Sequence, residues 1–148
     1  MLVNGWRLYQ HTLFQEQLAK LSAEVQRLAF SQPTTYREHP KTKLLATVLR
    51  YVTELIPRDP GSIEFRQGNT LGPDNRHWFR AKFHRRYRLF FRFSSREKII
   101  VYVWLNDELT LRKSGSKTDP YAVFKSMLAS GNPPHFLDDL LRKSEEVS

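Results

Sequence analysis

The chain has 148 residues, a net charge of +9 and no cysteine. This length predicts one domain that can fold without a disulfide or a metal ion, and the lack of cysteine excludes thiolate catalysis, cysteine-bound zinc and iron–sulfur clusters. The composition, 40% apolar and 13% aromatic, is that of a folded protein rather than a disordered basic tail, and the positive charge favours a polyanionic partner.

Two amphipathic helices are expected first, over residues 11–29 and 41–55. In each, apolar residues recur at spacings of three and four, which is the pattern of one helix face. In the first helix these residues are Phe14, Leu18, Leu21, Val25 and Leu28. Pro57 is expected to end the second helix. The short connection between the two helices predicts an antiparallel hairpin.

The pattern then changes to that of strands. We expect a short strand at 63–65, followed by a loop. Three consecutive antiparallel strands are expected at 78–83, 87–93 and 98–105, because these segments are rich in aromatic or β-branched residues and are separated by hairpin-sized turns.

Two further helical segments are expected at the end of the chain. Asp119 precedes a helix over 121–129 as its N-cap, and Gly131 follows it. The last segment, 135–146, is also expected to be helical. The whole order predicts an α+β domain with helices packed on one face of the sheet.

The positive charge is concentrated in residues 76–98. This segment holds nine Arg or Lys and one acid, a net charge of +8, whereas the rest of the chain has a net charge of +1. Seven aromatic residues are interleaved with these bases. Such a segment suits a nucleic acid, because cations bind phosphates and rings stack on bases. A twisted sheet with one solvated, arginine-rich face is the structural alternative.

Alternation along the strands places these bases on one face. Arg80 and Lys82 share a face of the first long strand, and Arg88 and Arg92 lie beside them on the second. The opposite, apolar faces are expected to meet the helices. Like charges facing one another destabilise a sheet, so a cluster of four cations favours a phosphate-binding surface over simple solvation.

The segment 86–91, Arg-Tyr-Arg-Leu-Phe-Phe, resembles a strand motif of the RelE-type toxin superfamily. The wider sequence is similar to one branch of it, the YhaV toxins of prokaryotic toxin–antitoxin systems. The similarity covers almost the whole chain. The matching positions are 4–6, 43–46, 65–66, 68, 71–72, 80–83, 86–92, 104–108, 110–112, 117–119, 121–124, 127, 131 and 133–134.

This resemblance implies a RelE-like fold in one domain over residues 1–148, with an N-terminal helical hairpin packed on a small twisted antiparallel sheet and C-terminal helices. It implies the toxin of a type II toxin–antitoxin system, a metal-independent ribonuclease that cleaves mRNA at or on the ribosome. A PrlF-type antitoxin is expected to neutralise it, and operator DNA is expected to bind only through the complex of the two proteins. No cofactor and no metal are expected.

In that superfamily the 2′-OH of the RNA attacks the adjacent phosphorus, so groups are needed that accept a proton, stabilise a phosphorane and protonate the leaving oxygen. The superfamily's basic strand pair matches Arg80 and Lys82, and its Tyr-Arg motif matches Arg88. The planar guanidinium of Arg88 suits a phosphate. Lys82 is a candidate base or, as the simpler alternative, a phosphate contact.

The superfamily pattern also has an arginine and a tyrosine after the last strand, which Arg112 and Tyr121 fit best. Lys117 is the alternative to Arg112. Three roles remain open for Tyr121: stacking on a base, acting as the catalytic base, or packing its helix. The neighbouring cationic or titratable residues expected to bind RNA are Arg85, Arg86, Arg92, Lys117 and His84.

Other residues have a competing structural explanation. Asp107 and Glu108 are candidate bases, but an ion pair with Arg112 is favoured for them. His84 is a candidate general acid or an exposed turn residue, and His135 is expected to be structural. Trp104 is expected in the core rather than at an RNA-stacking surface.

Two non-catalytic functions remain as alternatives, namely an RNA- or DNA-binding module and an operon co-repressor acting with the antitoxin. The first residues lack the pattern of a signal peptide, and the longest apolar run, 99–105, is too short to cross a membrane. We therefore expect a cytoplasmic protein with no membrane contact.

Overall fold

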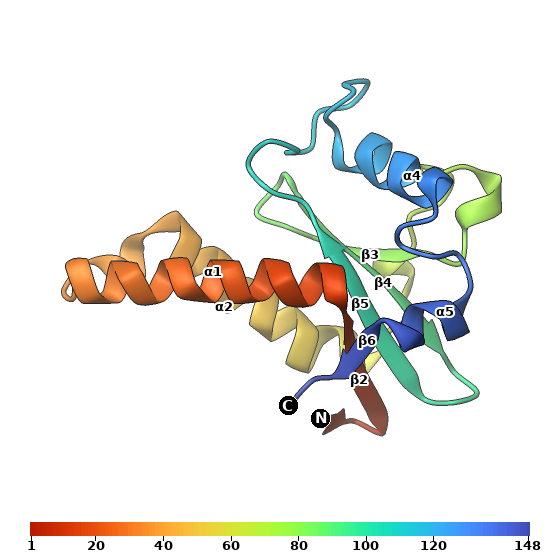
Figure 1. Cartoon of the computed structure of the whole chain (residues 1–148), viewed down its shortest axis with the longest axis horizontal. Helices are drawn as coiled ribbons and strands as arrows, with labels where there is room; N and C mark the ends of the chain where they lie inside the picture. Colours follow the sequence, from red (N-terminus) through yellow and green to blue (C-terminus); the bar gives the residue numbers. More distant parts are fainter.

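A six-stranded sheet runs through the computed structural model, which describes residues 1–148 (Figure 1). Its order is β1-β2-β5-β4-β3, and β6 pairs with β2. The strands are β1 (Leu2–Val3), β2 (Trp6–His11), β3 (Phe79–Phe83), β4 (Tyr87–Ser94), β5 (Ile99–Leu105) and β6 (Ser144–Glu146). The three consecutive strands expected from the sequence are confirmed as β3, β4 and β5, which pair antiparallel.

The expectation of a purely antiparallel sheet is wrong. β2 lies parallel to β5, with Arg7 opposite Ile99, and β6 lies antiparallel to β2. The strand expected at 63–65 is also wrong, because Ile63–Phe65 forms a 3₁₀ turn. A single bridge between Arg66 and Phe79 is the only strand-like pairing there.

The first two expected helices are confirmed as α1 (Thr12–Ser31) and α2 (Pro40–Arg50). They lie side by side and extend away from the sheet (Figure 1). Lys41 Nζ and Glu24 Oε2 form an ion pair of 2.7 Å between them. The N-cap of each helix is a histidine, since the ring nitrogens of His11 and His39 accept the N–H two residues on.

Pro57 changes the hydrogen bonding of the helix that precedes it. α2 continues as a π-helical turn, Tyr51–Leu55, and a last turn, α3 (Ile56–Arg58). The N–H of Ile56 donates to the carbonyl of Tyr51, and Pro57 has no N–H to offer the Val52 carbonyl. The hydroxyl of Tyr102 on β5 donates to that carbonyl instead, at 2.7 Å. The helix is thereby joined to the sheet.

Helices cover both faces of the sheet rather than one. On the first face α1 and α2 enclose an apolar core that includes Phe14, Val48, Phe91 and Tyr102. On the second face α4 (Pro120–Ser130) and α5 (Leu137–Arg142) enclose another. Residues of the second core include Trp78, Phe90, Trp104, Phe124 and Leu140, and the core position expected for Trp104 is confirmed.

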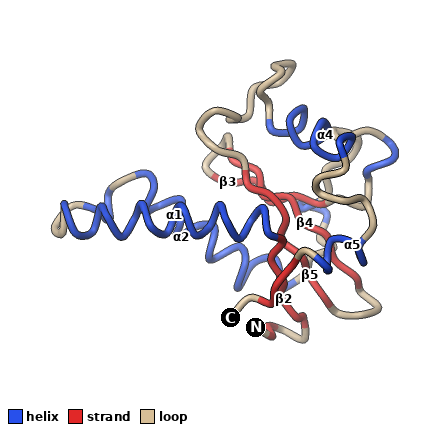
Figure 2. Tube along the Cα trace, viewed as in Figure 1, coloured by secondary structure: helices blue, strands red, loops and turns tan.

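The helix expected at 121–129 is confirmed as α4, with Asp119 as its N-cap and Gly131 in the left-handed conformation after it. The helix expected at 135–146 is wrong in its second half, because α5 ends at Arg142 and β6 follows. Figure 2 shows the long connection from β5 to α4 as an extended loop above the sheet. No helix has the length and apolar character needed to cross a membrane.

Candidate active site

Arg80 and Arg88 lie on the sheet face that α4 covers. Both side chains are buried, with about 8% of each residue exposed. The Nε of Arg80 donates to the hydroxyl of Tyr121 on α4 at 2.8 Å, and the Nε of Arg88 donates to the same oxygen at 3.1 Å. Two cations from neighbouring strands therefore converge on one phenol.

This arrangement corrects the expected open face of four cations. α4 covers part of that face, and backbone carbonyls and the Tyr121 phenol accept the hydrogen bonds that the arginines would otherwise make to water. Arg80 Nη1 donates to the carbonyl of Glu64 at 2.9 Å, and Arg88 Nη1 donates to the carbonyls of Arg85 and Tyr87 at 3.0 and 2.9 Å. Carbonyls and a phenol carry no full negative charge, so the positive charge of the two guanidiniums is not neutralised.

Arg112 joins the same group from the loop between β5 and α4. Its Cζ lies 4.9 Å from the centre of the Tyr121 ring, and its Nη1 makes an ion pair of 2.6 Å with Asp119 Oδ1. The ion pairs expected from Arg112 to Asp107 and Glu108 are wrong, because Asp119 takes that place. Asp107 instead accepts from the N–H of Leu109, within its own turn.

Four of the five expected catalytic residues thus lie together, since three arginines each contact Tyr121. We call Arg80, Arg88, Arg112 and Tyr121 the arginine–tyrosine cluster. The fifth, Lys82, lies directly opposite Arg88 in the β3–β4 register, on the same face. It is exposed, and its ammonium group makes no hydrogen bond or ion pair in the protein. Lys82 is therefore a free cation at the edge of the cluster.

The turn between β3 and β4 forms a basic rim beside the cluster. His84, Arg85 and Arg86 are all exposed there. His84 and Arg85 have positive φ angles of 47° and 63°, and His84 Nε2 lies 2.8 Å from the Thr47 hydroxyl. The turn is tied to the β5–α4 loop through Arg86, whose carbonyl accepts the Arg112 N–H and whose Nε donates to the Arg112 carbonyl.

Two of the residues expected to bind RNA, Lys117 and Arg92, lie outside the β3–β4 turn. Lys117 is exposed in the β5–α4 loop. Arg92 lies near the far end of β4, half-buried, with its Cζ 5.3 Å from the centre of the Trp78 ring. Burial lowers the pKa of Arg92 to about 10, which leaves it charged at neutral pH. Its Nη1 donates to the carbonyl of His135, so it belongs to a different group of residues.

That group contains two histidines. The rings of His77 and His135 meet edge to face at 4.5 Å. Burial and the charges of Arg92 and His135 lower the pKa of His77 to about 4. The Nε2 of His77 is buried and has no hydrogen-bond partner. No expected site residue other than Arg92 lies here.

Two residues that organise the cluster were not singled out for the reaction from the sequence. The carboxamide of Asn106 accepts the N–H of Arg88 at 2.7 Å and donates to the carbonyls of Arg86 and Thr110. It fixes the start of β4 against the β5–α4 loop. Asp119 was expected only as a helix cap, and its ion pair with Arg112 has no local sequence signal because the loop conformation creates it.

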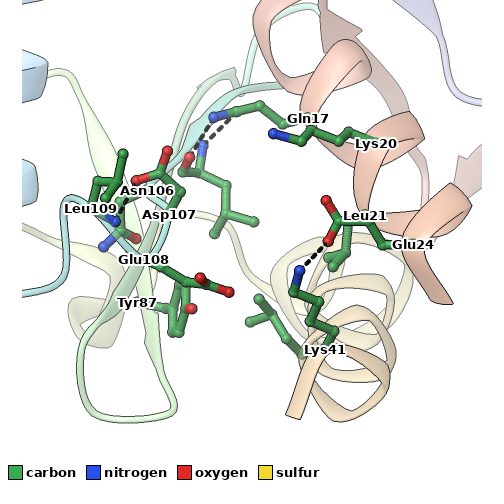
Figure 3. Close-up of a pocket in the computed structure, with 12 residues that line it drawn as sticks. Gln17, Lys20, Leu21, Glu24, Lys41, Tyr87, Asn106, Asp107, Glu108 and Leu109 are labelled. Carbon is green, nitrogen blue, oxygen red and sulfur yellow. Dashed lines mark hydrogen bonds and ion pairs between the residues drawn. The ribbon is translucent and has the colours of Figure 1, made fainter. Parts of the chain in front are cut away.

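A cavity of about 440 Å³ lies on the other side of this loop, between α1, α2 and the end of β5 (Figure 3). Glu108 and Asp107 approach it from one side and the Glu24–Lys41 ion pair from the other. Burial and these two nearby acids raise the pKa of Tyr87 in its wall. Asp107 and Glu108, the alternative candidate bases, line the cavity, but none of Arg80, Lys82, Arg88, Arg112 and Tyr121 does. Nowhere do three or more His, Asp or Glu side chains gather as potential metal ligands.

The arginine–tyrosine cluster has the chemistry of a phosphate site. The Nη2 groups of Arg80 and Arg88 make no hydrogen bond within the protein and are not sealed from solvent. A guanidinium presents its donors in a planar fork that matches phosphate oxygens. Three guanidiniums and a nearby ammonium, offset only by the Asp119 carboxylate on Arg112, leave a net positive charge that favours an anion with more than one negative charge, which is the character of a phosphorane.

Comparison with known proteins identifies the family of the chain. Residues 8–145 match the family model Toxin_YhaV, described as a toxin with endonuclease activity, of toxin-antitoxin system. "Ribonuclease toxin YhaV" of Escherichia coli strain K12 is 49% identical over 98% of this chain and 96% of its own length. "Toxin YhaV" of Escherichia coli O157:H7 has the same identity and coverage. "Toxin YhaV" of Escherichia coli O6:H1 is 48% identical over 97% of this chain and 95% of its own length.

No solved structure shows significant similarity to the chain. The family model and the relatives cover nearly the whole length, including every residue of the arginine–tyrosine cluster. The chain therefore belongs to the YhaV family, the toxins with endonuclease activity of toxin–antitoxin systems.

Proposed function

We propose that this protein is a ribonuclease toxin that cleaves mRNA through attack of the RNA's own 2′-OH on the adjacent phosphorus. The observation that carries the proposal is the convergence of Arg80, Arg88 and Arg112 on Tyr121, beside the free cation of Lys82. The ribonuclease named among the relatives supports RNA as the substrate.

In the proposed reaction the 2′-oxygen bonds to phosphorus, the bond from phosphorus to the 5′-oxygen breaks, and a 2′,3′-cyclic phosphate and a 5′-OH are formed. Arg88 and Arg80 stabilise the phosphorane through their free Nη2 groups, and Arg112 binds a further oxygen. Lys82, whose side-chain nitrogen makes no hydrogen bond or ion pair in the protein, is the candidate base: in its neutral amine form it accepts the proton of the 2′-OH, and in its ammonium form it is a phosphate contact.

Tyr121 is placed to donate its hydroxyl proton to a phosphate oxygen or to the leaving oxygen. Its oxygen already accepts two hydrogen bonds, from Arg80 and Arg88. A phenol has one proton to donate, and the two donors occupy the lone-pair side. The hydroxyl proton is therefore directed away from the arginines, and its acceptor is the substrate in this proposal.

Membership of a toxin–antitoxin family supports a protein antitoxin as a partner. We propose an antitoxin of the PrlF type, which binds operator DNA and brings the toxin to it only through their complex. The ribosome is the proposed setting for mRNA cleavage, in the cytoplasm. One RelE-like domain over residues 1–148 carries all of these functions.

The test uses two RNAs that differ at one atom. The purified chain, alone and with translating ribosomes, is incubated with an RNA and with the same RNA lacking the 2′-OH at the cleaved position. Cleavage of the first alone, leaving a cyclic phosphate, is the expected result. Cleavage of both RNAs would refute the internal nucleophile, and binding without cleavage in either setting would favour the non-catalytic module.

The matched variants are Arg88→Ala and Arg96→Ala. Both arginines belong to the basic segment, but Arg96 is exposed in the β4–β5 turn, away from the cluster. Arg88→Ala is expected to abolish most cleavage, while Arg96→Ala keeps it. Circular dichroism must accompany the assay, because Arg88 is buried and makes several internal hydrogen bonds.

A further inference from the structure

Asp119 is the carboxylate in contact with the arginine–tyrosine cluster. Its side chain is buried and binds three groups at once. Oδ1 accepts from Arg112 Nη1 at 2.6 Å and from the Lys113 N–H at 2.7 Å, and Oδ2 accepts from the Tyr121 N–H at 3.1 Å. One side chain therefore joins the end of the loop to the first turn of α4.

Asp119 thus joins Arg112 and Tyr121, the two members of the cluster that do not lie on the sheet. Tyr121 reaches Arg80 and Arg88 from α4, and Arg112 lies over the Tyr121 ring from the loop. The backbone of Arg112 is held by Arg86, but the backbone does not fix a long side chain. An unrestrained arginine loses much rotamer freedom when it binds a phosphate.

We propose that Asp119 is a positioning residue of the endonuclease. It holds the Arg112 guanidinium over the phenol ring before the substrate arrives, so that both groups meet the same phosphate. It contacts no substrate itself, because its two oxygens are buried and occupied by Arg112, Lys113 and Tyr121. This inference rests on the proposed function and adds to it a residue that acts through Arg112.

The variants of Asp119 distinguish its role as the N-cap of α4 from its ion pair with Arg112. Asp119→Ser keeps an N-cap for α4 but is too short to reach Arg112. Asp119→Asn retains one acceptor oxygen, so it cannot serve Tyr121 and the loop together. Asp139→Ser is the control, because it removes another Asp–Arg ion pair, to Arg142 on α5, outside the cluster.

The kinetics of RNA cleavage are the readout, with thermal unfolding measured for each variant. We expect Asp119→Ser to lower kcat about 100-fold with little change in KM, because misplacement of a catalytic group by about 1 Å has an effect of that size. Asp119→Asn is expected to be intermediate, and Asp139→Ser to match the wild type. In an Arg112→Gln background Asp119→Ser is expected to add little, since its partner is gone.

Additive losses from Asp119→Ser and Arg112→Gln would show a structural role only and would overturn the inference. Full activity of Asp119→Ser beside an inactive Arg88→Ala would also refute it, while the proposed function would stand. If Asp119→Ser does not fold, Asp119→Asn in the same cycle decides by the same criterion. Failure of the wild-type chain to cleave either RNA would refute the proposed function and this inference with it.

Discussion

Replacement of Tyr121 by phenylalanine removes one oxygen and leaves the ring. The ring packs edge to face on Phe90, with centroids 5.6 Å apart, and belongs to the second core. The lost oxygen is the acceptor for the Nε groups of Arg80 and Arg88. The variant therefore isolates the interaction of the phenol with the two buried cations.

The magnitude follows from these two bonds. A hydrogen bond to a charged group contributes about 1.5–3 kcal/mol to stability, and leaving such a donor buried and unpaired is costly. Two such losses give about 3–6 kcal/mol. Arg112, which covers the ring, has 30% of its side chain exposed, so water reaches the edge of the site and replaces part of the loss. We expect the free energy of unfolding to fall by about 2–4 kcal/mol.

The assay is urea denaturation followed by tryptophan fluorescence, with Tyr102→Phe as the matched control. Tyr102 is also a buried tyrosine, but its hydroxyl donates a single hydrogen bond to the neutral carbonyl of Val52. Its loss is expected to be about 1 kcal/mol. A Tyr121→Phe variant destabilised no more than Tyr102→Phe would refute the conclusion that the phenol satisfies the buried guanidiniums.

Three further outcomes are expected. His77 has its ordinary pKa of 6.5 in the unfolded chain and a pKa of about 4 in the folded protein, so the stability that it contributes is present above pH 6.5 and is lost as pH falls to 4. Between pH 7.5 and 4.5 the free energy of unfolding of the wild type should therefore fall by about 1–2 kcal/mol more than that of His77→Gln in urea denaturation, after a discount for solvent screening. Equal losses in the two proteins would contradict this prediction. Lys82→Gln should leave stability within about 0.5 kcal/mol and lower the slope of log affinity against log salt for single-stranded RNA by about 0.7, the value for one phosphate contact; an unchanged slope would exclude that contact. Lys41→Ala should cost about 0.2–1 kcal/mol through its partly exposed ion pair with Glu24, and more of that cost should disappear in 1 M salt than for a buried apolar substitution.

The parts of the fold that the sequence predicted are those with a strong local period. α1 and α2 carry apolar residues at helical spacing, and β3 to β5 alternate or are apolar throughout. β2 was missed because its alternation, with Trp6 and Leu8 buried and Arg7 exposed, is short and does not continue through Gln10, and because α1 begins directly after it. β6 has the sequence Ser-Glu-Glu, which has no strand propensity, and it pairs through its backbone.

The candidate site was predicted from the family resemblance more than from any pattern of charge. Alternation correctly placed Arg80 and Arg88 on one face, but it did not predict that α4 would cover them. Their cover depends on acceptors far away in sequence, the Glu64 carbonyl and the Tyr121 hydroxyl. A carbonyl has no sequence signature, so the burial of these cations could be known only from the folded chain.

The pairing of β2 has a consequence for the order in which the protein folds. β2 begins at the sixth residue and pairs locally with β1, but its other partners are β5 and β6, with Arg7 opposite Ile99 and Tyr9 opposite Glu146. Contacts between residues so distant in sequence form slowly, because a long loop must close first. During synthesis β2 therefore has only β1 beside it until β5 emerges, and β6 joins it last. The sheet of this toxin is therefore complete only after residues 144–146 have been made, which gives a partner protein the interval between β2 and β6 in which to meet it.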